Sequence, residues 1–126
     1  MESVFRAVLF LTGALHLLPF TLAFLPGRIA SSYGVEVSGA DMMLLLRHRA
    51  VLFGIVGSIM VHSAWTKRNY STALSIGMVS MLSFVLLYSL IGGINVKLQQ
   101  VMWIDLAASA ALICAGAVRL FTSKKG

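Results

Sequence analysis

The sequence predicts an all-α protein, an integral membrane four-helix bundle with both termini in the cytoplasm (N-in/C-in). Composition gives the first reason. Of the 126 residues, 59% are hydrophobic and only 11% are charged, and the mean hydropathy is +0.92. Soluble domains are about half apolar and about a quarter charged, so this chain has too little polar surface to cover a water-soluble globule.

The second reason is that the hydrophobic residues form four long runs. A helix that crosses a membrane needs about 20 mainly apolar residues, and each run is that long. The segment from Ser38 to Asp41 is typical of a capping box at the start of the second helix. We therefore expect a single transmembrane domain, residues 1–126, with almost nothing outside the bilayer. The predicted spans are residues 4–25, 42–65, 72–91 and 99–121.

The third reason is that the basic residues flank the apolar runs, and their distribution predicts the orientation. Cytoplasmic connections carry an excess of Lys and Arg. The side that holds both termini and the second connection has six basic residues: Arg6, Lys67, Arg68, Arg119, Lys124 and Lys125. The opposite side has four: Arg28, Arg47, Arg49 and Lys97. Six against four favours N-in/C-in, and the same flanking pattern argues against a nucleic-acid partner.

Small residues predict how the helices pack. Helices in lipid associate through close backbone approach and interhelical hydrogen bonds, because no hydrophobic force drives them together. Small side chains form stripes on the last three spans, which favours a compact bundle with room for membrane lipids, self-association or a membrane protein partner. Those on the second and third spans are Ala50, Gly54, Gly57 and Ser58, and Ala73, Gly77 and Ser80.

Asp105 lies inside the fourth predicted span and is a candidate site residue. That span leaves the membrane near Arg119, and counting back about 20 residues places Asp105 roughly 8 to 9 Å below the opposite surface. A carboxyl group at that depth must be protonated, hydrogen-bonded or paired. Ionisable groups are costly in a membrane and mark functional sites.

Arg47 is the predicted partner of Asp105. The charge-free run of residues 50–65 spans only about 24 Å as a helix, so the preceding Arg47, His48 and Arg49 lie near the outer interface. Arg47 shares a helical stripe with Ala50, Gly54 and Ser58 and is expected to face the bundle.

Arg49 and His48 are expected on other faces of the second span. Arg49 shares a stripe with Phe53, Val56 and Met60, so we expect it to face lipid and reach a headgroup phosphate. His48 falls between the two faces. The Arg47–Asp105 pair then has two readings: it only orients the second and fourth spans, or it anchors a polar or anionic ligand group.

Two further polar residues are candidates. His16 lies near the middle of the first span, where a histidine is either a hydrogen-bonded packing residue or a relay or ligand group. Asn95 follows Gly92-Gly93 in the last connection, where it forms a turn or bonds backbone or ligand.

The sequence carries no motif of a catalytic, metal or cofactor site. His16, His48 and His62 fall at different depths and lack zinc-ligand spacing. The chain has no Walker loop, no dinucleotide-binding G-x-G-x-x-G and no G-x-S-x-G elbow. Its one cysteine, Cys114, forms no intrachain disulfide. We therefore expect no metal and no cofactor, and the balance leans away from an enzyme.

Several motifs together resemble a family of small bacterial four-helix membrane proteins similar to the DoxX-like proteins. They are LRHRAVLFG at residues 46–54, Tyr33-Gly34-Val35 before it, and Gly92-Gly93-Ile94-Asn95 and Asp105 after it. The resemblance implies a bacterial inner-membrane location. It also implies that Arg47, His48, Arg49, Asn95 and Asp105 are the residues to test. Members of that family carry the label phosphopantetheine adenylyltransferase, a soluble enzyme with an H-x-G-H motif that this sequence lacks.

Three functions remain open from the sequence. The first is a non-enzymatic inner-membrane module that binds a ligand or partner through a polar site in the outer half of the bundle. The second, suggested by the DoxX-like resemblance, is an accessory subunit of a quinone-linked redox system. The third is a small transporter or channel built by self-association. The predicted site residues in the first case are Arg47 and Asp105, with His16, His48, Arg49 and Asn95 near them.

Overall fold

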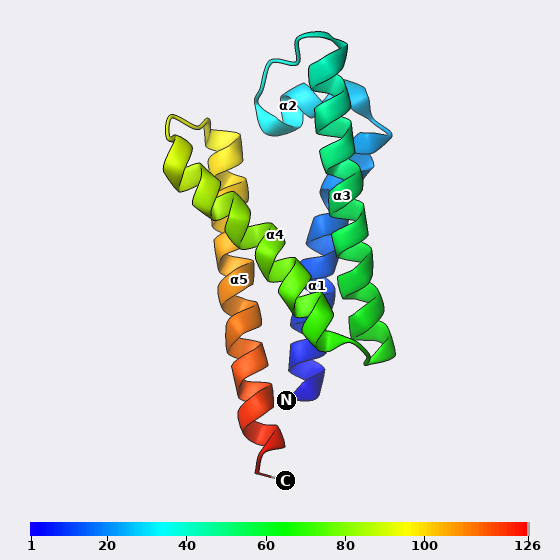
Figure 1. The fold of residues 1–126 in the computed structure, drawn as a ribbon, viewed down its shortest axis with the longest axis vertical. Helices are drawn as coiled ribbons and strands as arrows, with labels where there is room; N and C mark the ends of the chain where they lie inside the picture. The colour runs from blue at the N-terminus through cyan, green and yellow to red at the C-terminus, as the bar shows by residue number, and fades with distance from the viewer. Residues whose placement is uncertain (126) are drawn as a thin grey trace.

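The computed structural model describes residues 1–125, and helices are the only regular secondary structure in that part of the chain, which has no strands. The all-α prediction is confirmed. Four helices are long and apolar enough to cross a membrane, as the four hydrophobic runs predict. The elements are α1 (Glu2–Phe20), η1 (Thr21–Ala23), η2 (Pro26–Arg28), α2 (Ile29–Tyr33), α3 (Gly39–Thr66), α4 (Tyr70–Ile91) and α5 (Val96–Ser123), shown in Figure 1.

The helix ends differ by a few residues from the predicted spans. α3 begins directly after Ser38, as the capping-box pattern predicts, although the Ser38 side chain forms no capping hydrogen bond. α1 ends at Phe20 and continues as the short 3₁₀ turn η1, earlier than predicted. Pro19 lies inside the last turn of α1, where it has no N–H to donate to the Leu15 carbonyl. The other helices run past their apolar segments, since a helix continues until a turn stops it.

α1 and α3 approach most closely at a pair of glycines. A Cβ atom added to Gly57 would lie 2.7 Å from the carbonyl oxygen of Gly13, and one added to Gly54 would overlap the Phe20 ring. The stripe of small residues on α3 therefore packs against α1, as small residues do where backbones meet. On the other side of α3, the Met60 side chain packs against Gly77 of α4.

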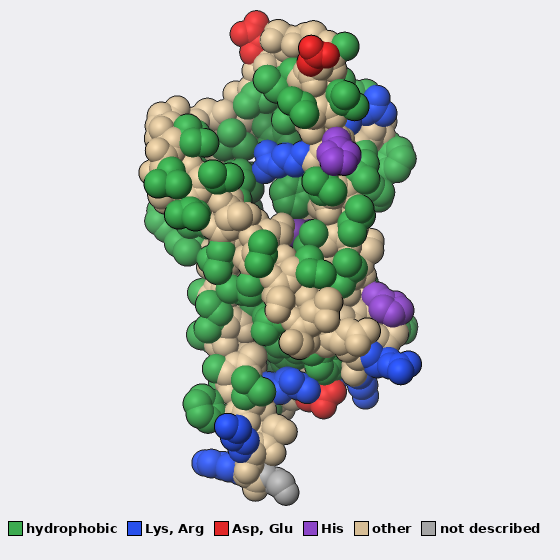
Figure 2. Space-filling model, viewed as in Figure 1, with side chains coloured by type: hydrophobic (Ala, Val, Ile, Leu, Met, Phe, Trp, Pro, Cys, Tyr) green, Lys and Arg blue, Asp and Glu red, His purple; other side chains and the backbone are tan. Residues whose placement is uncertain are grey.

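The bundle has two unlike ends. We call the end with both termini the terminal end, and the opposite end the α2 end (Figure 1). α3 and α4 meet at the tight turn of Lys67–Asn69 and diverge toward the α2 end, where α4 lies beside α5. In the space-filling view the surface is hollowed between α3 and α4 in the α2 half (Figure 2).

Buried side chains form two clusters. The larger one packs the terminal half, and the second lies beneath α2. The first cluster consists of Phe5, Leu9, Met60, Ala64, Ala73, Met81 and Leu112. The second consists of Leu22, Ala23, Ile29, Tyr33 and Ala50.

Candidate functional site

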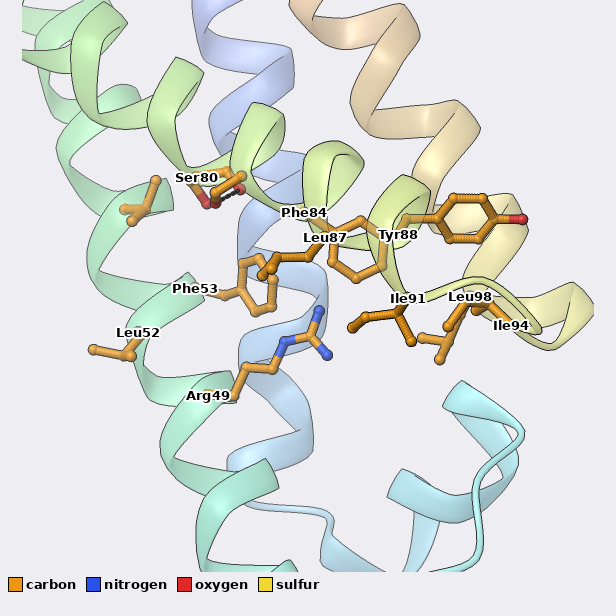
Figure 3. Close-up of a pocket in the computed structure, with 12 residues that line it drawn as sticks. Arg49, Leu52, Phe53, Ser80, Phe84, Leu87, Tyr88, Ile91, Ile94 and Leu98 are labelled. Carbon is orange, nitrogen blue, oxygen red and sulfur yellow. Dashed lines mark hydrogen bonds between the residues drawn. The ribbon is translucent and has the colours of Figure 1, made fainter.

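Arg49 is the centre of the candidate site. Its guanidinium carbon lies 5.3, 5.1 and 5.3 Å from the ring centroids of Tyr33, Phe53 and Phe84, which come from α2, α3 and α4. Cations are attracted to the faces of such rings at this distance. Figure 3 shows the side chain pointing from α3 into the space between the helices. The prediction that Arg49 faces lipid is therefore wrong.

Arg47 does not face the bundle interior, and the predicted Arg47–Asp105 pair is also wrong. Arg47 is exposed, and its Nε donates a hydrogen bond to the Ala23 carbonyl at 3.0 Å. The stripe that carries Arg47 packs against α1 and η1, so the arginine reaches the end of η1 and not α5. The face of Arg49, Phe53 and Met60 is the one that meets α4.

A lateral cavity of about 460 Å³ opens beside Arg49 between α3 and α4 (Figure 3). This volume is typical of small-molecule sites. The lining is apolar apart from Arg49, two serines and a tyrosine. Its residues are Arg49, Leu52, Phe53, Val56, Ser80, Ser83, Phe84, Leu87, Tyr88, Ile91, Ile94 and Leu98.

A second, smaller cavity lies on the other side of Arg49 and Phe53. We call it the polar cavity, because four side chains with functional chemistry line its volume of about 170 Å³. They come from four different elements: His16 on α1, Tyr33 on α2, Arg49 on α3 and Asp105 on α5. The structure therefore brings together three residues that the sequence singled out, and adds Tyr33.

His16 is 5% exposed and is held at both ring nitrogens. Nδ1 lies 2.9 Å from the carbonyl oxygen of Thr12, which can only accept, so Nδ1 carries the proton. In the neutral ring Nε2 then accepts from the Ser80 hydroxyl, 3.3 Å away on α4. The ring stacks at a tilt on Phe53, with centroids 5.7 Å apart. His16 thus ties α1 to α4 beside the site, with both ring nitrogens bonded.

Tyr33 has a buried hydroxyl with no hydrogen-bond partner among residues 1–125. The residue is 6% exposed and lines the polar cavity. Burial raises the pKa of the Tyr33 phenol above its usual value, and the positive charge of Arg49 opposes that shift. The phenol therefore stays protonated and is available as a donor. In the sequence, Tyr33 stands out only as part of the Tyr33-Gly34-Val35 motif that carries the family resemblance.

Asn95 positions Tyr33. Its Nδ2 donates to the carbonyl oxygens of Tyr33 and Gly34, at 3.0 and 3.1 Å. Its Oδ1 accepts from the backbone N–H of Leu98 at 2.9 Å and caps α5. The backbone role predicted for Asn95 is confirmed. All these bonds go to backbone groups, so Asn95 holds α2 against the start of α5.

Asp105 is half-buried, and Arg49 is the cation whose charge acts on its carboxyl group. Across residues 1–125, however, no acidic side chain lies within 4.0 Å of a basic one as an ion pair. His48 is exposed and lines neither the lateral nor the polar cavity. The described residues contain no group of three or more His, Cys, Asp or Glu that could hold a metal ion.

The comparisons with known proteins add no relative. No protein-family profile, no curated protein sequence and no solved structure matches the chain. The site must therefore be interpreted from its own chemistry.

Proposed function

We propose that the chain is a multi-pass protein of the bacterial inner membrane, oriented N-in/C-in. Four long apolar helices support the membrane location. Basic side chains gather at the terminal end (Figure 2), which supports a cytoplasmic position for that end. The α2 end, with Glu36 and Asp41, then lies on the outer side, and the site occupies the outer half of the bundle.

We further propose that the protein is a non-enzymatic module that binds an amphiphilic molecule from the bilayer. The polar head binds at Arg49, and the apolar part occupies the lateral cavity. The observation that carries this proposal is Arg49 itself. The guanidinium has five N–H donors, yet within residues 1–125 it forms neither an ion pair nor a hydrogen bond. A ligand head can supply acceptors for these donors, which the described residues do not bond.

The charges around Arg49 limit the kind of head that fits. Arg49 is the one cation on the polar cavity, and Asp105 is the one carboxyl group. A doubly charged phosphate would be repelled by Asp105 when that group is ionised. A monoanionic carboxylate meets less of that repulsion and a neutral carbonyl meets none, and both can accept bonds from Arg49 and Tyr33. We therefore favour a single-chain carboxylate or a carbonyl amphiphile.

A second candidate is a prenyl quinone, as in an accessory subunit of a quinone-linked redox system. The aromatic rings of Tyr33, Phe53 and Phe84 around Arg49 favour a planar, stacked headgroup. A quinone carbonyl accepts hydrogen bonds, and an isoprenoid tail is apolar like the lateral cavity. This candidate differs from the first in the head, not in the place of binding.

Native mass spectrometry from mild detergent, with palmitate and a decyl benzoquinone as probes, tests both candidates. Arg49→Gln should weaken binding of the preferred probe about tenfold or more, because a charged hydrogen bond contributes about 1.5–3 kcal/mol. Arg47→Gln is the matched control, since it removes an exposed arginine two residues away on the same helix. Equal binding by both variants, or no binding of either probe to the unmodified protein, would contradict the proposal.

A further inference from the structure

The cavities around the site form a series, and a third one leads to the α2 end. This mouth cavity has a volume of about 270 Å³. Thr21, Arg28 and Ser32 are exposed, polar and part of its lining. The mouth cavity and the polar cavity share three wall residues: Leu18, Pro19 and Tyr33. The two cavities therefore border on the same three side chains.

The polar and lateral cavities are neighbours in the same way. Arg49 and Phe53 line both of them. The His16–Ser80 hydrogen bond joins a residue of the polar cavity to one of the lateral cavity. Mouth, polar cavity and lateral cavity thus follow one another from the α2 end to the ligand site.

The polar cavity has polar groups that can bond water, although most of its lining residues are apolar. Its volume of about 170 Å³ is large enough for several waters. A buried water needs two to four polar partners, and the cavity supplies them from four elements. In the unliganded protein, water can bond the Tyr33 hydroxyl, which has no partner among the described residues. The titratable or charged groups on the cavity are His16, Tyr33, Arg49 and Asp105, and α4 adds Ser80 through its bond to His16.

We propose that these cavities form an aqueous path that enters at the α2 end beside Tyr33 and reaches Asp105 and His16. The path lets these two groups exchange protons with the water on the α2 side while a ligand occupies the lateral cavity. The other side is closed by the core of the terminal half, where Phe5, Leu9 and Met60 are at most 2% exposed. The role of the path rests on the proposed ligand site, but the path itself belongs to the unliganded protein.

Cysteine accessibility tests the path in sealed membrane vesicles of both orientations. The background is Cys114→Ser, which removes the single, exposed cysteine. Asp105→Cys reports on the path and Ser32→Cys on its mouth. Ala107→Cys is the matched control, because Ala107 is exposed, lines no described cavity and lies about 3 Å further along α5. The probe is silver ion, read as loss of later maleimide labelling in the intact mass.

We expect silver ion to block maleimide labelling of Asp105→Cys at least tenfold faster than labelling of Ala107→Cys. We also expect it to act from the same side of the membrane as on Ser32→Cys. Ala108→Cys, which also lines the polar cavity, repeats the measurement without removing the carboxyl group. Protection no faster than in Ala107→Cys, or from the side opposite to Ser32→Cys, would overturn the path. Loss of ligand binding with protection intact would instead overturn the ligand site alone.

Discussion

The terminal half and the α2 half of this bundle differ in how some of their polar side chains are hydrogen-bonded. In the terminal half, Arg6 donates through Nε to the Ala64 carbonyl at 2.8 Å, and Ser63 donates to the Arg68 carbonyl. The Tyr70 hydroxyl donates to Glu2 at 3.2 Å. In the α2 half, the buried Tyr33 hydroxyl has no hydrogen-bond partner in residues 1–125. The Arg49 guanidinium there contacts three rings without a bonded acceptor, as Arg119 contacts two rings in the terminal half.

The two halves also differ in how tightly their side chains pack. The terminal half holds the larger buried cluster, whereas α3 and α4 diverge in the α2 half around a cavity of about 460 Å³ (Figure 1). A cavity and polar groups without hydrogen-bond partners lower the free energy of unfolding, and proteins keep such regions where function needs them. The terminal half therefore provides most of the buried packing, and the α2 half carries the candidate site.

The largest expected effect is a loss of packing in the terminal half. Met60 is fully buried, so Met60→Ala should lower the free energy of unfolding by about 2–5 kcal/mol. Leu87 is 53% exposed and lines the lateral cavity, so Leu87→Ala should cost much less. Thermal unfolding in mild detergent compares the two variants. Equal losses would contradict the division into two halves.

The sequence predicts some parts of the fold and not others. The four long helices could be predicted, because a segment that crosses a membrane must satisfy its own backbone and stay apolar for its whole length. The rotation of α3 could not, because apolar side chains face lipid and core alike. The stripe of Ala50 and Gly54 is a packed face, as the small residues predict. α3 also has a second packed face, which carries Phe53 and Met60. The sequence pattern does not distinguish this face from one that faces lipid.

The candidate site was predicted in part for the same reason. His16 and Asp105 stand out in any apolar span because they are ionisable, and both line the polar cavity. The prediction that Arg47 faces the bundle and Arg49 faces lipid is wrong because it depends on the rotation of α3 about its axis. Tyr33 could not be placed, because its position depends on Asn95, which lies 62 residues away in the chain.

The next effect in size is expected at Asn95. Asn95→Ala removes the cap of α5 and both bonds to α2, and a lost cap alone costs about 0.5–2 kcal/mol. Asn95→Asp keeps the acceptor for Leu98 but not the donor for Tyr33. If Asn95 positions Tyr33, both variants should weaken ligand binding, and only Asn95→Ala should lose the full stability. Unfolding in detergent and probe binding are measured together. Binding unchanged in both variants would show that α2 stays in place without Asn95.

A smaller effect separates the two arginines. Arg6→Met should lower the free energy of unfolding by about 1 kcal/mol, because the Ala64 carbonyl loses its donor. Arg49→Met should leave it unchanged or raise it, since a charge without a bonded acceptor is replaced by an apolar side chain of similar length. Thermal unfolding without added ligand gives both values. A clear loss for Arg49→Met would mean that its contacts with the three rings hold the α2 half together.

The smallest expected effect is at the Tyr33 hydroxyl. Tyr33→Phe keeps the ring beside Arg49 and removes a group that no protein atom bonds, so the free energy of unfolding should change by less than about 0.5 kcal/mol. Ser109→Ala is the comparison, because its buried hydroxyl donates to the Asp105 carbonyl at 2.7 Å and its loss should cost about 0.5–1.5 kcal/mol. Both are measured by unfolding in detergent without ligand. If Tyr33→Phe proved the more harmful, the hydroxyl would be part of the scaffold, and Arg49 alone would remain as the free donor of the site.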